Sequence, residues 1–349
     1  MKAILAAVLT VVAVPAVVDK PPVIKEWPVP WGESRPRDPF VDQTTGRIYF
    51  CGQAGNYIAY LDPATGEFKR FEFPKGEMVG PHNLIVDKQG IVWYAGNLAG
   101  HIGSLDPRTG TWKRYPMPDP MVKDPHTMIF NRDGDIWFTA QGGNAIGKLT
   151  VSTGNVQLIK VPTPNARPYG IKLDSKGRPW VVEFGTNKIA TVDPATMQLR
   201  EITLPNADAR PRRIEITSND KIYYGDYARG VLGRYDPASG KFDEFPLPGG
   251  AESRPYGMAT DGEDRVWVVQ TSRPNQFVSF DTKTQKFSEP TAVPSGGGTV
   301  RHMYYDAATK SIWFGTDANT IGQAVVPPRE PGVTPETWDR ERAGFVVKR

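Results

Sequence analysis

The sequence predicts an all-β fold, a seven-bladed β-propeller of four-stranded blades, and three observations carry this prediction. First, the motif Arg-Pro-Tyr-Gly-Ile at residues 167–171 recurs seven times at steps of 43 to 45 residues. Its proline position is occupied in turn by Pro36, Pro81, Pro125, Pro168, Pro211, Pro255 and Val300. Self-similarity at a period of ~40–50 residues indicates a repeat architecture. Second, each copy leads through a polar turn into an aromatic segment such as residues 92–94. Third, 35 Gly and 33 Pro separate short segments rich in β-branched and aromatic residues, which is typical of strands.

Each repeat contains four predicted strands. In the fourth repeat these are the motif strand at residues 169–173, the aromatic strand at 180–182, a third strand at 187–193 and an outer strand that ends at Leu-Pro. Pro and Gly occupy the intervening turns, where their backbone preferences suit them. Four strands in each of seven repeats indicate a propeller.

The segments at the two ends of the repeat region predict how the ring of seven blades closes. Residues 23–30 resemble the segment that completes each later repeat, such as residues 68–74, whereas the seventh repeat ends at Val325 without one. We therefore expect the N-terminal segment to supply the missing strand of the last blade. Closure of this kind removes unpaired strand edges.

The remaining segments predict processing and location. Residues 1–16 resemble a signal peptide, because Lys2 precedes an apolar run that is too short to span a bilayer. The predicted boundaries are 1–16 for the signal peptide, 17–326 for the propeller and 327–349 for a C-terminal tail with a short helix starting after Thr334. A single cysteine excludes an intramolecular disulfide, and together with export this favours a periplasmic or secreted protein without stable membrane insertion. The small net charge of +4 argues against nucleic acid as a partner.

The residue after each repeat proline begins the innermost strand, so we expect its side chain to point at the central axis. Around the ring these residues are Arg37, His82, His126, Tyr169, Arg212, Tyr256 and Arg301. The residues before the proline position are Arg35, Gly80, Asp124, Arg167, Arg210, Arg254 and Thr299. Guanidinium groups bind carboxylate and phosphate in bidentate fashion. The predicted substrate-binding set is therefore Arg37, Arg167, Tyr169, Arg212, Arg254, Tyr256 and Arg301, and the predicted ligand is a small molecule that is anionic or rich in carbonyl groups.

His82 and His126 take the same position on adjacent blades, so we expect their imidazoles to lie side by side. Such a pair suits general acid–base chemistry near neutral pH. Asp124 is placed to orient one imidazole or to hold a cation. The alternative is that the two histidines line the channel without chemistry. The other histidines, His101 and His302, are expected to be structural or exposed.

The repeat resembles the virginiamycin B (streptogramin) lyase family over residues 23–325, through Arg-Pro-Tyr-Gly-Ile, Gly-x-x-Trp-Phe-Thr and Asn-x-Ile-Gly-x-Leu. The resemblance implies elimination at the ester of a cyclic depsipeptide antibiotic, in which a histidine removes the proton alpha to the ester carbonyl with the help of Mg²⁺ and acidic residues. Aligned end to end, the family's site positions are Tyr256, Thr299-Val300-Arg301 and Asp317. Rotated around the ring they are His82, Asp124-Pro125-His126 and Gln141. The rotated match implies catalytic roles for His82 and His126 and magnesium ligation by Asp124 and Gln141.

Three functions follow from these features. The first is a metal-assisted carbon–oxygen lyase that acts on an ester or lactone at the channel mouth. The second is a non-catalytic propeller that binds an anionic small molecule or a partner protein. The third is a lactonase like the gluconolactonase-type propellers, which needs a Glu, Asn and Asp cluster on the axis, where the sequence offers Glu183 and Asp226.

Overall fold

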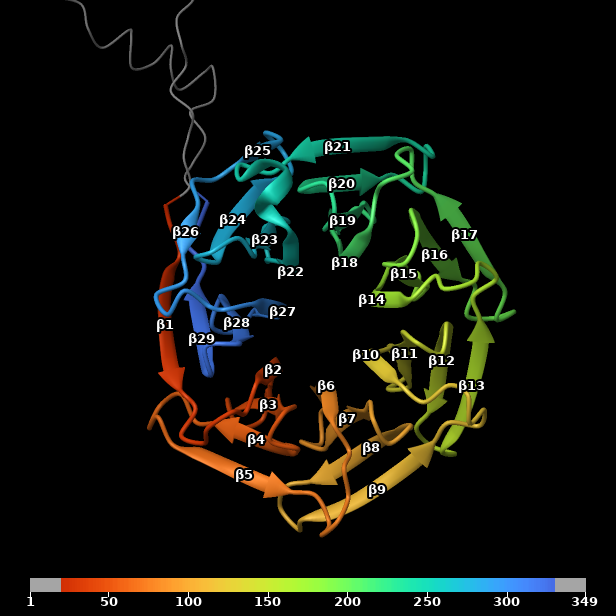
Figure 1. Ribbon diagram of the computed structural model, residues 1–349, viewed down its shortest axis with the longest axis vertical. Helices are drawn as coiled ribbons and strands as arrows, with labels where there is room; N and C mark the ends of the chain where they lie inside the picture. Colours follow the sequence, from red (N-terminus) through yellow and green to blue (C-terminus); the bar gives the residue numbers. More distant parts are fainter. Residues whose placement is uncertain (1–19, 330–349) are drawn as a thin grey trace, which may run out of the picture.

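The predicted seven-bladed β-propeller is the fold of this protein. The computed structural model describes residues 20–329, and Figure 1 shows their seven sheets arranged radially about one axis. The first strand of each repeat lies nearest to the axis. The axial region between these innermost strands is called the channel below. The predicted signal peptide and the predicted tail helix lie outside the described residues and stay predictions.

The strands follow the repeats of the sequence. Blade 1 contains β2 (Pro36–Val41), β3 (Ile48–Gly52), β4 (Tyr57–Leu61) and β5 (Phe68–Glu72). Blade 2 contains β6 (Pro81–Val86), β7 (Val92–Gly96), β8 (His101–Asp106) and β9 (Thr111–Pro116). Blade 3 contains β10 (Pro125–Phe130), β11 (Ile136–Ala140), β12 (Ala145–Thr150) and β13 (Asn155–Lys160). Blade 4 contains β14 (Pro168–Leu173), β15 (Pro179–Glu183), β16 (Lys188–Val192) and β17 (Leu199–Thr203). Blade 5 contains β18 (Pro211–Ile216), β19 (Ile222–Asp226), β20 (Val231–Tyr235) and β21 (Phe242–Pro246). Blade 6 contains β22 (Pro255–Thr260), β23 (Val266–Gln270), β24 (Gln276–Asp281) and the short strands β25 (Lys286–Phe287) and β26 (Thr291–Ala292). Blade 7 contains β27 (Val300–Asp306), β28 (Ser311–Thr316), β29 (Thr320–Val325) and β1 (Val23–Pro28).

The N-terminal strand closes the ring as predicted. β1 pairs antiparallel with β29 from Val23, opposite Val325, to Pro28, opposite Thr320. The Trp27 indole stacks on Trp313 with ring centroids 5.7 Å apart. The last blade is therefore built from both ends of the propeller sequence.

The blades adhere through buried aromatic side chains on their second strands. Trp180 is fully buried and belongs to one apolar cluster with Ile214 and Tyr224 of the next blade. Its indole nitrogen donates a hydrogen bond of 3.0 Å to Asp174, which also accepts the backbone N–H of Arg178 in the preceding turn. This pairing satisfies a polar group that burial would otherwise leave costly. It explains why an aspartate and a tryptophan recur six residues apart in the repeat.

Every innermost strand carries a β-bulge just after the repeat proline position. In blade 4, for example, Pro168 pairs with Glu183, but the register shifts before Ile171 pairs with Val181. The other six blades show the same irregularity at the equivalent place. A bulge re-aims side chains and interrupts the alternation of faces. Two consecutive residues of each inner strand can therefore face the channel.

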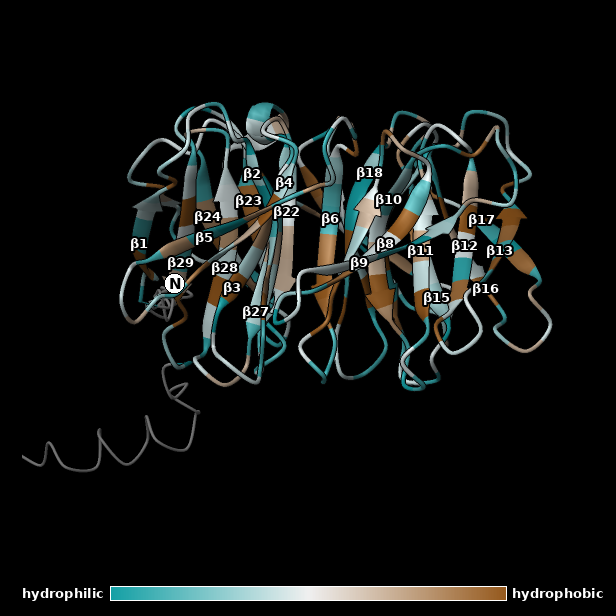
Figure 2. Ribbon diagram, turned by 90° about the horizontal axis from the view of Figure 1, so that it is seen from below, coloured by the Kyte–Doolittle hydropathy of each residue, from teal (hydrophilic) through white to brown (hydrophobic). Residues whose placement is uncertain are grey.

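The inner strands begin at one face of the propeller, called the mouth below. Pro81 at the start of β6 pairs with Gly96 at the end of β7, so the loops that precede the inner strands share this face with the loops between second and third strands. The described residues contain one helix, the 3-10 helix η1 (Gly250–Ser253), which rises at the mouth above β22 (Figure 2). No helix within residues 20–329 is long and apolar enough to cross a membrane.

Candidate functional site

The residues predicted to ring the axis are brought together there. The His82 and His126 rings lie with centroids 3.8 Å apart, and the His126 ring lies 4.1 Å from that of Tyr169. The hydroxyls of Tyr169 and Tyr256 are hydrogen-bonded to one another. These four side chains are each at most 5% exposed. They lie side by side at the channel, on the inner strands of blades 2, 3, 4 and 6.

Arg212 lies within a group of aromatic rings. The central carbon of its guanidinium is 3.7 Å from the Tyr256 ring centroid, 4.5 Å from that of Tyr227 and 4.6 Å from that of Phe184. Cation–π contacts of this kind stabilise a guanidinium that burial has separated from water. Among residues 20–329 no carboxylate pairs with this arginine, so the aromatic rings hold it in place.

The other predicted arginines differ in position. Arg37 is buried and donates from Nη1 to the side-chain oxygen of Gln53 at 2.8 Å. Arg301 is half-buried and forms an ion pair with Asp317. Arg167 and Arg254 are exposed in the mouth loops, so they lie at the rim and not in the channel.

A second layer of polar residues, to which the repeat pattern assigned no role, lies beside this ring. It consists of the residues two positions after the repeat proline, which the bulges turn toward the axis: Asp38, Asn83, Thr127, Arg213 and His302. The consecutive polar pairs Arg37-Asp38 and Arg212-Arg213 were the signal in the sequence that could have revealed it.

Arg213 spans the channel within this layer. From β18 in blade 5 it donates to the Arg301 carbonyl in blade 7 at 3.0 Å and to the Thr127 hydroxyl in blade 3 at 3.1 Å. Its Nη2 is 3.8 Å from a carboxylate oxygen of Asp38 in blade 1. Contacts with three other blades require the side chain to cross the axis. Arg213 therefore links four of the seven blades at their centre.

The channel has more buried donors than protein acceptors. Within the described residues, Arg37 Nε and Nη2, Arg212 Nε and Arg213 Nη2 are buried without a hydrogen-bond partner. Among the described ion pairs, Arg37 and Arg213 both approach Asp38, whereas Asp317 pairs with Arg301. Burial would raise the pKa of Asp38, but His302, Arg37 and Arg213 hold it below its usual value, so the carboxylate stays charged. Buried donors without partners are costly, which favours an anionic or oxygen-rich occupant.

The environment keeps the histidines neutral and makes one tyrosine acidic. Burial and the nearby arginines hold the pKa values of His82 and His126 well below the usual range. Burial likewise lowers the pKa of His302 to about 3. Burial alone would raise the pKa of Tyr256, but Arg212, Arg37 and Arg213 lower it to about 8. The channel thus holds neutral imidazoles beside a phenol that ionises easily.

The predicted magnesium ligands do not form a fitting donor set. Both carboxylate oxygens of Asp124 accept backbone N–H groups, from Gly142 and, at 2.8 Å, from Gly143. A hard cation takes six or more oxygen ligands, of which several are usually carboxylates or carbonyls. Within residues 20–329 no group of three or more His, Cys, Asp or Glu side chains is arranged to hold a metal ion. Asp124 instead fixes the loop around Gln141, and magnesium binding stays a prediction without a step in the chemistry below.

The two carboxylates offered for a lactonase are also held within their own blades. Asp226 accepts the backbone N–H of Arg210 at 2.9 Å and an ion pair from Arg229 at 3.2 Å. Glu183 accepts from the Thr186 hydroxyl at 3.1 Å, and burial beside Glu201 raises its pKa to about 7. Neither carboxylate contributes to a cluster on the axis.

His101 was expected to be structural or exposed, and the structure shows it buried in blade 2. It begins β8, is 4% exposed, and its Nε2 lies 3.4 Å from the Tyr94 hydroxyl.

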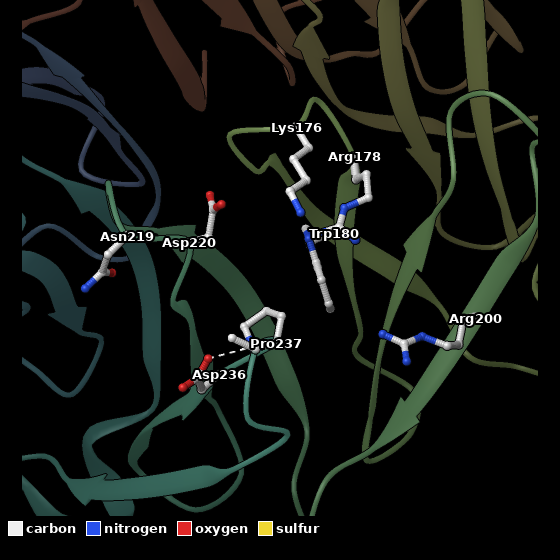
Figure 3. Close-up of a pocket in the computed structure, with 9 residues that line it drawn as sticks. Lys176, Arg178, Trp180, Arg200, Asn219, Asp220, Asp236 and Pro237 are labelled. Atoms are coloured by element: carbon white, nitrogen blue, oxygen red, sulfur yellow. Dashed lines mark hydrogen bonds between the residues drawn. The ribbon is translucent and has the colours of Figure 1, made fainter.

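A cavity of about 220 Å³ lies outside the channel, between blades 4 and 5 at the face opposite the mouth (Figure 3). Lys176, Arg178 and Arg200 reach it from blade 4, whereas Asp220 and Asp236 belong to blade 5. The acids are already engaged, because Asp220 accepts from Ser175 and Asp236 pairs with Lys221. The cavity is a junction between blades and not an extension of the channel.

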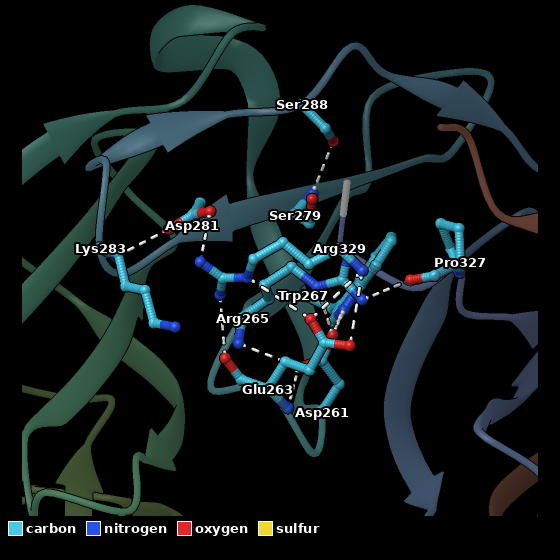
Figure 4. A network of polar contacts seen from close by, with 10 residues as sticks. All are labelled: Asp261, Glu263, Arg265, Trp267, Ser279, Asp281, Lys283, Ser288, Pro327 and Arg329. Atoms are coloured by element: carbon cyan, nitrogen blue, oxygen red, sulfur yellow. Dashed lines mark hydrogen bonds and ion pairs between the residues drawn. The ribbon is translucent and has the colours of Figure 1, made fainter. Parts of the chain in front are cut away.

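A second charged network ties the chain beyond the ring to blade 6 (Figure 4). Arg265 is 1% exposed, pairs with Asp261 at 2.7 Å and donates to the Pro327 carbonyl at 2.6 Å. Arg329 pairs with Asp281 at 2.7 Å. These contacts hold residues 327–329 against the outside of the propeller and leave the channel untouched.

Comparison with known proteins agrees with the propeller geometry. A sequence model of the Virginiamycin B lyase family matches residues 16–280. The chain belongs to the virginiamycin B lyase family. The predicted family resemblance is thereby confirmed. A search of curated proteins finds no match.

Several solved structures share the propeller fold of this chain over most of its length. A virginiamycin B lyase from Staphylococcus aureus is 21% identical with a TM-score of 0.78, and the match covers 87% of this chain and 99% of that one. A streptogramin B lyase is 25% identical with a TM-score of 0.77, and the match covers 87% and 97%. An extracellular domain from B. thetaiotaomicron is 16% identical with a TM-score of 0.68, and the match covers 88% of this chain and 43% of that one.

Proposed function

We propose that the channel binds a small molecule that carries a carboxylate or another oxygen-rich anionic group. The observation that carries this proposal is the set of buried guanidinium N–H groups of Arg37, Arg212 and Arg213 that have no acceptor within the described residues. An anion in the channel would accept these hydrogen bonds. It would also offset the positive charge that the arginines focus on the axis.

Calorimetric titration with succinate and inorganic phosphate tests the binding site. We expect saturable binding, weakened at least about tenfold by Arg212→Ala, because removal of a buried charged partner costs several kcal/mol. Arg200→Ala, at an exposed arginine of β17, is the matched control and should bind as the unaltered chain does. Equal binding by both variants would refute a site in the channel.

A lyase reaction is the second part of the proposal, and family membership together with the adjacent rings of His82 and His126 supports it. His126 is the base. Its Nδ1 lies 2.9 Å from the Thr127 hydroxyl, which leaves Nε2 for the substrate. Since burial and the arginines keep the ring neutral, its lone pair is available at pH 7.

The proposed reaction is an elimination, which consumes no water molecule. His126 takes the proton from the carbon next to a carbonyl, the electron pair forms a carbon–carbon double bond, and the bond to the ester oxygen breaks. A carboxylate leaves, and His126 carries the proton. Arg37 and Arg212 would stabilise the enolate-like charge and the departing carboxylate. These guanidinium groups supply the positive charge that the resemblance assigned to a metal ion.

Mass spectrometry distinguishes the reaction from its alternatives. The probe is quinupristin, with which a Staphylococcus aureus virginiamycin B lyase of 22% identity was solved. Elimination linearises a cyclic ester without a change in mass, whereas hydrolysis by a lactonase adds one water. We expect linear product of unchanged mass, with or without a chelator, and its loss in His126→Ala but not in the control His101→Gln. Equal turnover by His126→Ala would remove the assignment, and abolition by the chelator would contradict a reaction without metal.

If neither quinupristin nor a simpler cyclic ester is opened while the anions still bind, the channel serves binding alone. We further propose export of the chain to the periplasm or the exterior, supported by the apolar N-terminal segment and by the extracellular propeller domain among the similar structures. Cell fractionation with antibody detection tests the location.

A further inference from the structure

The rim of the mouth is divided into a cationic and an apolar part. Immediately before the repeat proline, blades 1, 4, 5 and 6 carry arginines: Arg35, Arg167, Arg210 and Arg254. Blades 2 and 3 carry Gly80 and Asp124 at this place. The arginines therefore lie on one side of the mouth, and blades 2 and 3 lack them.

Three of the rim arginines adopt a backbone conformation that favours glycine. Arg35, Arg167 and Arg254 have φ of +46°, +56° and +47°, similar to the +57° of Gly80 in the equivalent position. Left-handed backbone is less favourable for a residue with a side chain than for glycine. Since glycine fits this turn in blade 2, the turn itself does not require arginine. A strained residue that the turn does not require indicates a functional role, such as contact with a ligand.

Blades 2 and 3 instead expose large apolar side chains. Met78, Leu98 and Met121 are 64%, 65% and 79% exposed. Within residues 20–329 the other exposed large apolar side chains are Val23 at 71% and Val325 at 43%, which face each other across β1 and β29 at the far end from the mouth.

The three apolar side chains, called the apolar lip below, lie along one stretch of the rim. The Leu98 N–H donates to the Val79 carbonyl at 3.0 Å, and the Leu98 side chain covers Gly80, so Leu98 is adjacent to the loop of Met78. On the other side Asn97 donates to the Pro125 carbonyl at 3.1 Å, which joins the Leu98 loop to the loop that contains Met121. The inner strands below this stretch are β6 and β10, which begin with the prolines before His82 and His126.

We propose that the ligand of the channel is a soluble amphipathic anion, with an anionic head that reaches the channel arginines and an aliphatic or aromatic body that lies on the apolar lip. The inference rests on the proposed anion binding and adds the class of the ligand. Exposed apolar side chains are common singly, but a group of them beside a binding site marks a contact surface. The arginines on the opposite side of the rim attract the anionic head of the ligand toward the channel and repel cations.

A lipid bilayer is the other surface that such a face could fit. The channel argues against it, because Arg37 and Arg213 are at most 6% exposed and lie below the rim, beyond the reach of headgroups in a flat membrane. A single molecule that enters the mouth can reach both the lip and these arginines. The proposal therefore commits to a soluble ligand.

The test compares linear carboxylates from butanoate to decanoate, each below its micellar concentration, by calorimetric titration. Half-burial of each added methylene on the lip raises the affinity about twofold. We expect this increase in the unaltered chain and in the control Val23→Ser, which removes an exposed apolar side chain far from the mouth. In the double variant Leu98→Ser, Met121→Ser the increase with chain length should vanish while butanoate binds as before.

The outcomes separate this inference from the proposed function. If no carboxylate binds at all, the proposed anion site fails. If butanoate binds but affinity does not rise with chain length, or rises equally in the double variant, the apolar lip is not part of the site and the inference fails alone. Co-sedimentation with vesicles of anionic phospholipid, lost in the double variant and unaffected by decanoate, would assign the lip to a membrane and also overturn it.

Discussion

Replacement of Arg213 by methionine should destabilise the whole propeller, because one side chain joins four blades at the axis. Methionine keeps the apolar stem and part of the volume but removes the guanidinium. The substitution loses the hydrogen bonds to the Arg301 carbonyl and to Thr127, and it leaves Asp38 with less compensation. Arg213, Asp38 and Thr127 are all buried.

The expected loss of unfolding free energy follows from the burial of the charges on Arg213 and Asp38. Removal of one partner from a buried ion pair costs about 3–5 kcal/mol, because the other charge remains desolvated. Asp38 keeps Arg37 at 3.7 Å and the Asn83 amide at 2.9 Å, so we expect a loss near the lower limit, about 3 kcal/mol. An exposed arginine makes a smaller contribution, and Arg200→Met should change the free energy of unfolding by less than about 0.5 kcal/mol.

Urea denaturation followed by tryptophan fluorescence measures the effect, and a double variant tests its cause. If the stranded carboxylate of Asp38 accounts for the loss, Asp38→Asn should restore at least about 1 kcal/mol in the Arg213→Met background while it destabilises the unaltered chain. A loss below about 1 kcal/mol in Arg213→Met, or strictly additive effects of the two substitutions, would refute the account of a charged link at the axis.

Two other predictions concern the tyrosine pair and ring closure. Ultraviolet titration should show one tyrosine that ionises near pH 8 and is absent in Tyr256→Phe; because this pKa lies below the usual 10.0, the folded state loses its proton first, and stability relative to Tyr256→Phe should rise between pH 8 and 10. If no tyrosine ionises below pH 9, the arginines do not lower the pKa of Tyr256 and the prediction fails. Trp27→Ala should lower the free energy of unfolding by about 2 kcal/mol through loss of its stacking on Trp313, and faster proteolysis within residues 20–30 is the expected readout; unchanged protection would show that β1 closes the ring without it.

The repeat made the architecture predictable, and the backbone bulges limited what could be predicted of the site. The period fixed the blades, and the unmatched segments at both ends fixed the closure at β1. The proline position located the first residue of each inner strand, so the neighbourhood of His82, His126 and Tyr169 followed directly. Strict alternation in a strand would have turned the next residue, such as Arg213, away from the axis. The register shift after each proline places it in the channel instead, and in the sequence only consecutive polar pairs such as Arg212-Arg213 accompany that shift.

The roles assigned to Asp124, Arg167 and Arg254 stay predictions, and the positions of these residues in the structure have a related physical origin. Asp124 was assigned to a cation from its position before His126, but its carboxylate satisfies the N–H groups of Gly142 and Gly143, which the loop leaves without strand partners. Arg167 and Arg254 precede the inner strand by one residue and so belong to the rim. A short polar side chain near a loop often binds the loop itself, and residue spacing alone does not distinguish that from ligand binding.

The two polar layers of the channel have different relations to stability and function. Asp38 and Arg213 lie between blades with partners on several of them, so substitution there changes the fold and the site together. Arg212 belongs to the other layer, which consists of the residues directly after the repeat proline and is called the outer ring here. Aromatic rings hold its guanidinium, and its Nε has no acceptor within the described residues. A group that is positioned by packing and unsatisfied in hydrogen bonding can exchange one ligand for another without loss of the fold. Substitutions of Arg212 should therefore affect binding more than stability, and substitutions of Arg213 the reverse. Comparison of the two variants in the same binding and denaturation assays tests whether the outer ring, and not the whole channel, is the functional part of this propeller.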